Sequence, residues 1–322
     1  MLGGSSFDPG HDARGMNDGN SQKTLVKLSI VIPTYNAHEW IEQCLDSIQL
    51  HRPASDYEVI VDDDHSSDDT LAIVRAKFPA VRPFSNEKNL GFGKTVNVGL
   101  RASVGAYILV LNNDTWMHAG ALDAMVAYLD QHADAGIVGP RVLSGDGSLQ
   151  QQCRRRIPTP AAALLYFTGI AKLFPKNPRV AGYLMTAADE HETADVDAVS
   201  GACLMVRRAV LDQIHGFDEE YYLYGEDMDF CWRTKLAGWK VVYYPTAVIT
   251  HFGGQGGTGK RRLYATIEWH RAMWIFYRKH RAPRVAFPER ALVYSGIALK
   301  GAVAIAVNAL RRSTTPGTAK PQ

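Results

Sequence analysis

Three short apolar runs, each followed directly by polar residues, constrain the fold of this chain more than any other feature. The runs cover residues 25–32, 57–61 and 107–111. Uninterrupted runs rich in valine, isoleucine and leucine are typical of strands that are buried on both faces. Helical patterns lie between the runs, so the chain alternates strand, helix and strand. This order predicts an α/β domain with a doubly wound sheet.

The polar residues after the three runs predict a ligand site. They are Thr34, Asp62–Asp64 and Asn112–Asp114. In open α/β sheets, ligands bind beyond the carboxyl ends of the strands. Asp114 could bind a hard divalent cation there, together with His251 and a diphosphate.

The second half of the chain is less regular. Residues 150–195 contain several prolines and the run Arg154–Arg156, and they predict a long excursion from the domain. A strand is expected at 196–206, and two more at 240–244 and 247–250 lead to His251. A helix is expected to carry the carboxylates of the Glu226–Trp232 stretch.

Glu226, Asp227 and Asp229 begin that helix, among aromatic residues. Acidic residues in a first turn are often solvated and favoured by the helix dipole. The aromatic neighbours argue against full solvation of this cluster. A carboxylate in such a pocket can gain the basicity that a general base requires.

Two glycine-rich segments could suggest a phosphate-binding loop. Gly93-Lys94-Thr95 lacks the earlier glycine, because that position is Lys88. Gly254–Lys260 has the glycine spacing, but Arg261 stands where a hydroxyl should bind magnesium. A nucleotide hydrolase that uses this second loop is therefore the weaker alternative, and a flexible loop over a site is the plainer interpretation.

Seven motifs in fixed order carry a family resemblance. They are SIVIPTYNA (29–37), VDDDHSSDDT (61–70), NLGFGKTVNVGL (89–100), LNNDT (111–115), SGACLMVRR (200–208), GFDEEYYLYGEDMDFCWR (216–233) and HFGG (251–254). Together they resemble the family 2 glycosyltransferases of the GT-A fold, especially the bacterial rhamnosyltransferase-like branch. The resemblance implies a Rossmann-like, doubly wound mixed sheet over residues 27–255.

The resemblance also implies roles for individual residues. The donor nucleotide would be bound by Pro33, Thr34, Tyr35, Asp63, Asn89, Gly91, Phe92 and Asn113, with Asp63 on the pyrimidine base. Asp114 and His251 would bind Mg²⁺ or Mn²⁺. Asp227 would be the catalytic base, and Glu226 and Trp232 would shape the acceptor side. The implied reaction is a single inverting displacement on a nucleotide sugar.

Asn112 stands where the metal-binding motif of the family begins with an acidic residue. Because of this difference, the chain could instead be a catalytically silent homologue that only binds a nucleotide sugar. For an active enzyme, the overall resemblance favours rhamnose from dTDP-rhamnose as the donor sugar. A UDP-hexose or UDP-N-acetylhexosamine donor remains the alternative.

The C-terminal part of the chain is strongly basic. Residues 260–312 contain twelve Lys and Arg residues against Glu268 and Glu289, although the whole chain carries a net charge of only +2. A basic segment on an acidic body points to an anionic partner, either a membrane or a nucleic acid. We expect no nucleic-acid partner, because no nucleic-acid motif accompanies the basic residues.

Residues 291–310 are apolar apart from Lys300 and are long enough to span a membrane. The glycines and the mid-segment lysine favour an amphipathic helix on an anionic membrane surface instead. A helix packed on the domain is a third possibility. The resemblance pairs such a tail with a lipid-linked glycan acceptor.

The chain is therefore expected to have three parts. Residues 1–26 would be a disordered leader, 27–255 the GT-A domain, and 256–322 a membrane-associating tail of basic amphipathic helices. The polar N-terminus lacks the apolar core of a signal peptide. A cytoplasmic protein, peripheral on the inner face of a bacterial plasma membrane, is the expectation.

Overall fold

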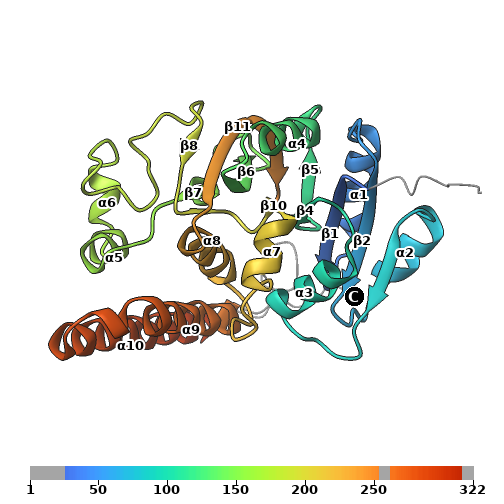
Figure 1. Ribbon diagram of the computed structural model, residues 1–322. Coiled ribbons are helices and arrows are strands. Elements are labelled where there is room, and N and C mark those ends of the chain that lie inside the picture. The colour runs from blue at the N-terminus through green and yellow to red at the C-terminus, as the bar shows by residue number, and fades with distance from the viewer. Residues whose placement is uncertain (1–25, 254–261, 314–322) are drawn as a thin grey trace, which may run out of the picture.

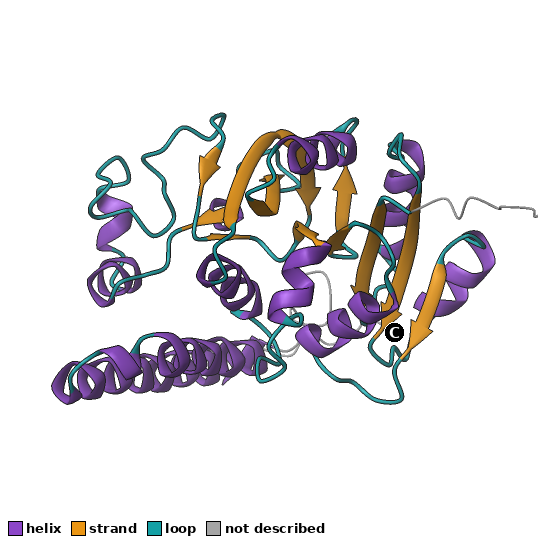
Figure 2. Cartoon of the chain, viewed as in Figure 1, coloured by secondary structure: helices purple, strands orange, loops and turns teal. Residues whose placement is uncertain are grey.

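The computed structural model describes residues 26–253 and 262–313. Strands and helices alternate along most of the described chain (Figures 1 and 2). The strands are β1 (Leu28–Thr34), β2 (Tyr57–Asp63), β3 (Arg82–Ser85), β4 (Tyr107–Leu111), β5 (Thr115–Met117), β6 (Ala135–Leu143), β7 (Arg154–Arg155), β8 (Ala194–Asp195), β9 (Ala198–Val199), β10 (Cys203–Arg207) and β11 (Lys240–His251). The helices are α1 (Ile41–Leu50), α2 (Thr70–Lys77), α3 (Phe92–Ala102), α4 (Ala121–Gln131), α5 (Pro160–Phe167), α6 (Ile170–Leu173), α7 (Arg208–Ile214), α8 (Glu226–Leu236), α9 (Arg262–His280) and α10 (Phe287–Ser313), with 3-10 turns η1 (Gln151–Cys153) and η2 (Ala282–Arg284).

Within the described residues, one nine-stranded sheet organises the domain. Its main path is β3-β2-β1-β4-β10-β6-β11-β5, and β8 pairs with β11. The first four strands of this path are parallel, whereas β10 lies antiparallel between β4 and β6. The predicted doubly wound mixed sheet is therefore confirmed.

The register of the parallel strands brings the predicted polar residues to one edge of the sheet. Thr34 at the end of β1 lies opposite Asp63 at the end of β2. All seven residues of β1 are buried, and so are the five of β4, as the continuous apolar runs predict. The buried strands thus hold the polar strand ends in fixed positions.

Several elements differ from those expected. The sequence pattern did not reveal β6, although it lies in the middle of the sheet between β10 and β11. The strand expected at 196–206 is divided into β9 and β10 by a turn at 200–202. The two strands expected at 240–250 are one long strand, β11, with an irregularity in its pairing between Tyr244 and Val248.

The last two helices form a long hairpin beside the domain (Figure 1). The basic end of α9 is bound to the acidic stretch before α8 and to α8 itself. Lys279 lies 2.8 Å from Glu220 and also pairs with Asp218, and His280 Nε2 lies 2.6 Å from Asp229 Oδ1. Part of the basic charge of the tail therefore holds the hairpin on the domain.

Helix α10 leaves much of its apolar surface exposed. Residues 287–308 have a mean hydropathy of 1.5 over their most apolar window, which is long and apolar enough to cross a membrane. By itself, one such helix is weak evidence for a span. The expected leader lies outside the described residues, apart from position 26, and so does the loop from Gly254 to Lys260.

Candidate active site

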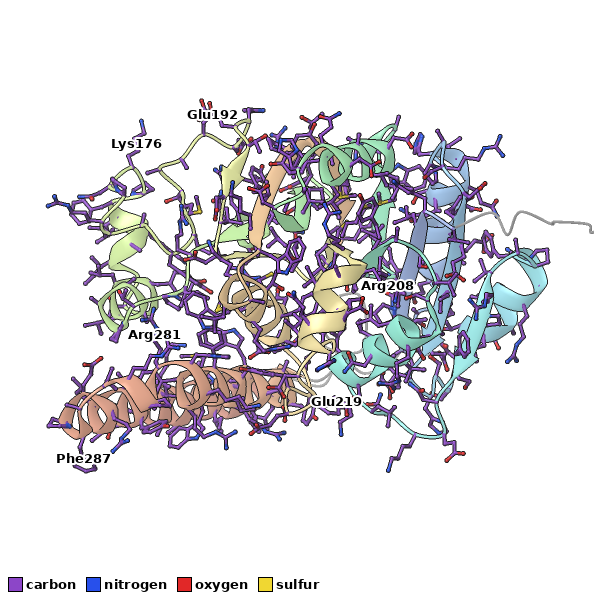
Figure 3. All side chains as sticks on the ribbon, viewed as in Figure 1. Lys176, Glu192, Arg208, Glu219, Arg281 and Phe287 are labelled. Atoms are coloured by element: carbon purple, nitrogen blue, oxygen red, sulfur yellow. The ribbon has the colours of Figure 1, made fainter. Side chains whose placement is uncertain are left out.

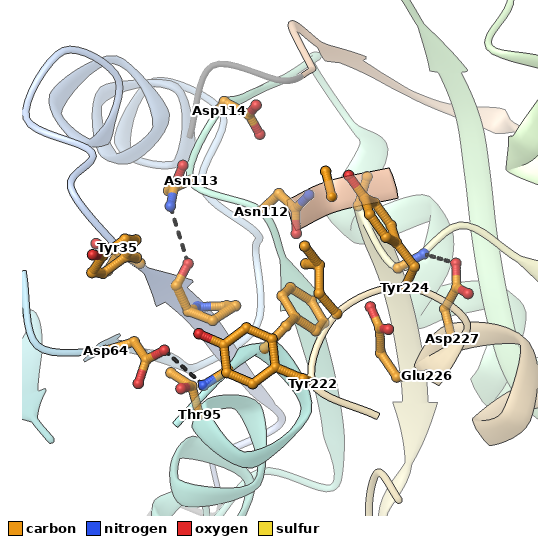
Figure 4. A pocket seen from close by; sticks show the side chains of 18 of the residues that line it. Tyr35, Asp64, Thr95, Asn112, Asn113, Asp114, Tyr222, Tyr224, Glu226 and Asp227 are labelled. Carbon is orange, nitrogen blue, oxygen red and sulfur yellow. Dashed lines mark hydrogen bonds between the residues drawn. The ribbon is translucent and has the colours of Figure 1, made fainter. Parts of the chain in front are cut away.

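One cavity of about 400 Å³ lies at the carboxyl ends of β1, β2 and β4 (Figure 4). It gathers most of the residues that the sequence singles out. Those that line it are Pro33, Thr34, Tyr35, Asn89, Gly91, Phe92, Asn113, Asp114, Glu226, Asp227 and His251. Segments far apart in the chain therefore meet at the edge where the sheet predicts a ligand.

Two predicted site residues do not line the cavity. Asp63 is buried below it, where its Oδ2 accepts a hydrogen bond of 2.9 Å from the Ser66 amide. Its Oδ1 is also buried and has no hydrogen-bond partner among the described residues. Trp232 lies further along α8, packed against the core, and its buried indole N–H likewise has no partner there.

Asp64, which the sequence did not separate from its acidic neighbours, lines the cavity and organises a loop. Its Oδ1 accepts a 2.6 Å hydrogen bond from the Leu90 amide, and its Oδ2 accepts one of 2.9 Å from the Gly91 amide. Gly91 has a φ of +86°, and an added Cβ would lie 2.7 Å from the carbonyl oxygen of Tyr222. Only glycine fits this position without strain or displacement.

Aromatic side chains form one wall of the cavity. The Tyr222 hydroxyl donates a hydrogen bond to Asn89, and the Tyr222 carbonyl accepts one of 2.9 Å from the Phe92 amide. The Tyr222 ring also packs edge-on against Tyr264 of α9, with centroids 5.7 Å apart. The tail hairpin therefore contributes to the site, which the sequence did not suggest.

Asp114 and His251 meet at another side of the cavity. His251 Nε2 lies 3.1 Å from Asp114 Oδ1. The Gln150 amide fixes the imidazole, because its Nε2 donates a 2.7 Å hydrogen bond to the His251 carbonyl oxygen. Gln150 Oε1, 2.9 Å from Nδ1, must then accept the Nδ1 proton. In a neutral imidazole with its proton on Nδ1, Nε2 carries the lone pair and faces Asp114.

These groups fit a hard divalent cation. Asn112 Oδ1 is buried without a hydrogen-bond partner among the described residues, and Asn112 Nδ2 lies 3.4 Å from His251 Nε2. Carboxylate, amide oxygen and imidazole nitrogen are ordinary ligands for Mg²⁺ or Mn²⁺. No three His, Cys, Asp or Glu side chains gather in the described ranges, so a cation here would need further oxygen ligands, such as those of a diphosphate.

Two adjacent carboxylates, Glu226 and Asp227, begin helix α8. Asp227 Oδ2 accepts hydrogen bonds of 2.6 Å from Arg155 Nη2 and 2.9 Å from the Gly201 amide. Its Oδ1 accepts only one described hydrogen bond, from the Met228 amide at 2.7 Å. Although burial opposes its charge, the Asp227 carboxylate raises the pKa of the Arg155 guanidinium. One oxygen of Asp227 is thus held in place while the other keeps a lone pair available.

Glu226 lies beside Asp227 in a different environment. Its side chain is buried, and Oε2 has no hydrogen-bond partner among the described residues. Burial, reinforced by the neighbouring Asp227 charge, raises the pKa of Glu226 to about 8. The protonated form of Glu226 is therefore favoured at neutral pH.

Arg155 and Gln150, like Asp64 and Tyr264, are contacts of the candidate site that sequence reasoning missed. Arg155 belongs to a run of three arginines in the 150–195 excursion, yet it is buried against Asp227. Nothing in the spacing of Gln150 relates it to His251, which lies 101 positions later. Only the path of the excursion back to the sheet brings these residues to the cavity.

Comparison with known proteins identifies the family of this chain. The family model described as "Glycosyl transferase family 2" matches residues 29–214, and "Glycosyl transferase family group 2" matches residues 166–304. An N-acetylglucosaminyl-diphospho-decaprenol L-rhamnosyltransferase of Mycobacterium tuberculosis is 29% identical over 299 residues. That alignment covers 89% of this chain and 95% of the relative.

Solved structures share the fold. The mannosyltransferase PcManGT from Pyrobaculum calidifontis, in complex with GDP-Man and Mn²⁺, matches with a TM-score of 0.56 at 18% identity, over 92% of this chain and 76% of that one. Staphylococcus aureus TarS 1–349 matches with a TM-score of 0.51 at 18% identity, over 87% and 81%. With the family match spanning more than half of its residues, the chain belongs to glycosyl transferase family 2 and has the GT-A fold.

Proposed function

We propose that this glycosyltransferase moves rhamnose from dTDP-rhamnose to a lipid-linked glycan with inversion at the anomeric carbon. The observation that carries the proposal is one cavity in which Asp114 and His251 on one side and the carboxyl groups of Glu226 and Asp227 on another face the same space. The name of the mycobacterial relative supports both the sugar and a diphospho-polyprenol acceptor. A UDP-hexose or UDP-N-acetylhexosamine donor is the alternative.

The donor nucleotide would lie against the ends of β1 and β2. Pro33, Thr34, Tyr35 and the 89–92 loop provide this wall of the cavity. Asn113 is oriented by its hydrogen bond of 3.2 Å to the Pro33 carbonyl oxygen. Asp63 is still proposed to bind the pyrimidine base. Its Oδ1 is buried and has no hydrogen-bond partner among the described residues, so the backbone on the nucleotide side would have to shift for the base to reach it.

Asp114 and His251 would hold a divalent cation, with the Asn112 amide oxygen beside them. Such a cation supplies charge neutralisation to a departing diphosphate. Gln150 keeps His251 in the tautomer that presents Nε2 to the site. Outer hydrogen bonds of this kind orient metal-binding imidazoles and affect their affinity.

Asp227 would take the proton from the acceptor hydroxyl. Its Oδ1 keeps a free lone pair, while Arg155 and the Gly201 amide fix Oδ2. The acceptor oxygen then forms its bond to the anomeric carbon from the face opposite the nucleotide as the bond to the diphosphate breaks. Glu226, protonated at neutral pH, would donate a hydrogen bond on the acceptor side.

The α9–α10 hairpin would bind the inner face of the plasma membrane and bring the cavity to its acceptor. Phe287, Leu292 and Leu299 are exposed apolar residues on α10. An amphipathic helix with basic residues binds anionic lipid through both kinds of side chain. The contact of Tyr264 with the cavity wall would connect this surface to the site.

A donor panel tests the proposal. Purified protein is incubated with Mn²⁺ or Mg²⁺, nucleotide sugars and a bacterial lipid extract, and released nucleoside diphosphate is measured. Release from dTDP-rhamnose that needs both metal and lipid is expected. Release from a UDP-sugar alone would replace the proposed donor, and donor binding without release from any sugar would favour a catalytically silent homologue.

A further inference from the structure

Exposed apolar side chains are concentrated in two parts of the molecule. Apart from Leu50, Val104 and Leu236, every large exposed apolar residue in the described ranges belongs either to the α9–α10 hairpin or to α5, α6 and the residue after them. The second group consists of Leu164, Ile170, Leu173 and Phe174, which are 63%, 39%, 74% and 54% exposed. Nothing in the proposed tail–membrane contact explains this second group.

The charge within the stretch that carries α5 and α6 has one sign. Residues 157–188, here called the α5–α6 segment, contain no Asp or Glu. Their three cations are Lys172, Lys176 and Arg179, which are exposed and form no described salt bridge. Leu173, Phe174, Lys176 and Arg179 also line one shallow hollow. Apolar and cationic side chains are therefore combined on one surface.

Both ends of the segment are anchored to the stretch around β7, whose Arg155 contacts Asp227. Strand β7 precedes it, and there Arg155 donates its hydrogen bond to Asp227. The segment returns to the same strand where Arg154 Nη2 donates a 2.8 Å hydrogen bond to the Ala188 carbonyl oxygen and the Arg156 amide donates one of 2.9 Å to that of Tyr183. The segment thus projects from the acceptor side of the cavity.

The segment and the tip of the tail hairpin lie at the same end of the molecule. In Figures 1 and 3, α5, α6 and Lys176 lie at the left, as do Arg281 and Phe287 at the hairpin tip. A nucleic acid would match the cations but leave the exposed leucines and phenylalanine without a partner.

We propose that the α5–α6 segment is a second membrane-contacting surface, which binds an anionic phospholipid bilayer through Leu164, Leu173 and Phe174 and the cations Lys172, Lys176 and Arg179. Apolar side chains enter the acyl boundary while lysine and arginine pair with lipid phosphates. The inference rests on the proposed membrane-bound acceptor. Together with α10, the segment holds the acceptor side of the cavity against the bilayer.

Vesicle co-sedimentation of the full chain tests this surface. Vesicles of phosphatidylcholine alone and of phosphatidylcholine with phosphatidylglycerol at 3:1 are compared. The variant Leu173→Asp/Phe174→Asp is expected to lower partitioning onto the anionic vesicles at least tenfold. The variant Lys172→Gln/Lys176→Gln/Arg179→Gln, which leaves the apolar residues intact, should lose most of the preference for phosphatidylglycerol. Leu50→Asp, at a site 66% exposed on α1, is the matched control and should bind as the parent chain does.

The tail variant Leu292→Asp/Leu299→Asp separates the two proposals. If it abolishes binding while both segment variants partition like the parent chain, the second surface is wrong and the tail contact stands. If the parent chain itself binds neither kind of vesicle, the membrane contact in the proposed function is wrong as well. Analytical ultracentrifugation tests whether a second copy of the chain covers this surface instead. A dimer that is dissociated by Leu173→Asp/Phe174→Asp, with no change in vesicle binding, would also overturn the inference.

Discussion

Arg155 Nη2 donates a 2.6 Å hydrogen bond to Asp227 Oδ2, and both side chains are largely shielded from solvent. Arg155 comes from the 150–195 excursion and Asp227 from the first turn of α8, so this pair joins the excursion to the proposed catalytic base. The Gly201 amide binds the same oxygen, and an added Cβ at Gly201 would lie 3.1 Å from the Asp227 Cβ. Asp227, at the start of α8, is therefore positioned by contacts from two other segments.

Breaking this pair should be costly. Arg155→Met leaves the Asp227 carboxylate buried without its cation, and the loss of one partner of a buried pair typically lowers the free energy of unfolding by about 3 kcal/mol. Urea denaturation measures the change. The neighbouring Arg156→Met is the control, because Arg156 is 46% exposed and lies 3.5 Å from Asp197, and its loss should cost less than about 1 kcal/mol. Equal losses of unfolding free energy in the two variants would show that the buried Arg155–Asp227 pair contributes no more to stability than an exposed pair.

Glu226 should make stability depend on pH. Its pKa rises from an ordinary value near 4.5 to about 8 in the folded chain, because of burial. The unfolded chain releases this proton near pH 4.5, whereas the folded chain retains it up to about pH 8. The stabilisation is therefore complete at low pH and is lost as the pH rises across this window.

Glu226→Gln removes the titration. Between pH 5.5 and 8, the unfolding free energy of the parent chain should fall relative to that of this variant by at least about 1 kcal/mol, the equivalent of less than one pKa unit. Urea denaturation at both pH values measures the difference, with the exposed Glu219→Gln as control. A parallel pH dependence in the parent chain and Glu226→Gln would refute the raised pKa.

Gln150 should control cation affinity without touching the cation. Gln150→Ala removes both hydrogen bonds that fix His251, and losses of this kind weaken metal binding by about 10- to 100-fold. Titration of Mn²⁺ followed by electron paramagnetic resonance, with a nucleoside diphosphate present, measures the affinity. Gln213→Ala, which removes an amide hydrogen-bonded to Trp239 far along the chain, should leave it unchanged. Unaltered Mn²⁺ affinity in Gln150→Ala would contradict the positioning role.

Gly91 should be intolerant of a side chain. Gly91→Ala places a Cβ 2.7 Å from the Tyr222 carbonyl oxygen at a φ of +86°, so the loop must shift and donor affinity should fall at least tenfold. Calorimetry with the nucleotide donor measures this change. Gly147→Ala is the control for backbone strain alone, because Gly147 has a φ of +82° and nothing within 4 Å of the added Cβ. If both variants bind donor like the parent chain, the loop is not part of the donor site.

The fold could be predicted where local patterns were strong. The buried runs of β1, β2 and β4 and the polar residues after them fixed one half of the sheet and the edge that carries the cavity. Strand β6 was missed because Gly136, Gly139 and Pro140 interrupt its apolar pattern. The antiparallel position of β10 depends on long-range pairing with β4 and β6, which no local signal encodes.

The site was partly predictable for the same reason. Residues within ordered motifs, such as Asp114 and Asp227, lie in the cavity as expected. Arg155, Gln150 and Tyr264 reach it from the excursion and from α9, whose positions follow from tertiary packing. The net charge of the tail overstates the number of cations that are available to lipid, because Lys279 is paired with Asp218 and Glu220 of the domain.

The most direct measurement is the turnover of Asp227→Asn beside that of the parent chain. With dTDP-rhamnose, Mn²⁺ and lipid extract, we expect the rate of dTDP release to fall by about 10²- to 10⁴-fold, the usual contribution of a general base. Donor affinity measured by calorimetry should stay within about threefold, because Asp227 acts on the acceptor. Turnover of Asp227→Asn equal to that of the parent chain would contradict the central claim that this carboxylate activates the acceptor.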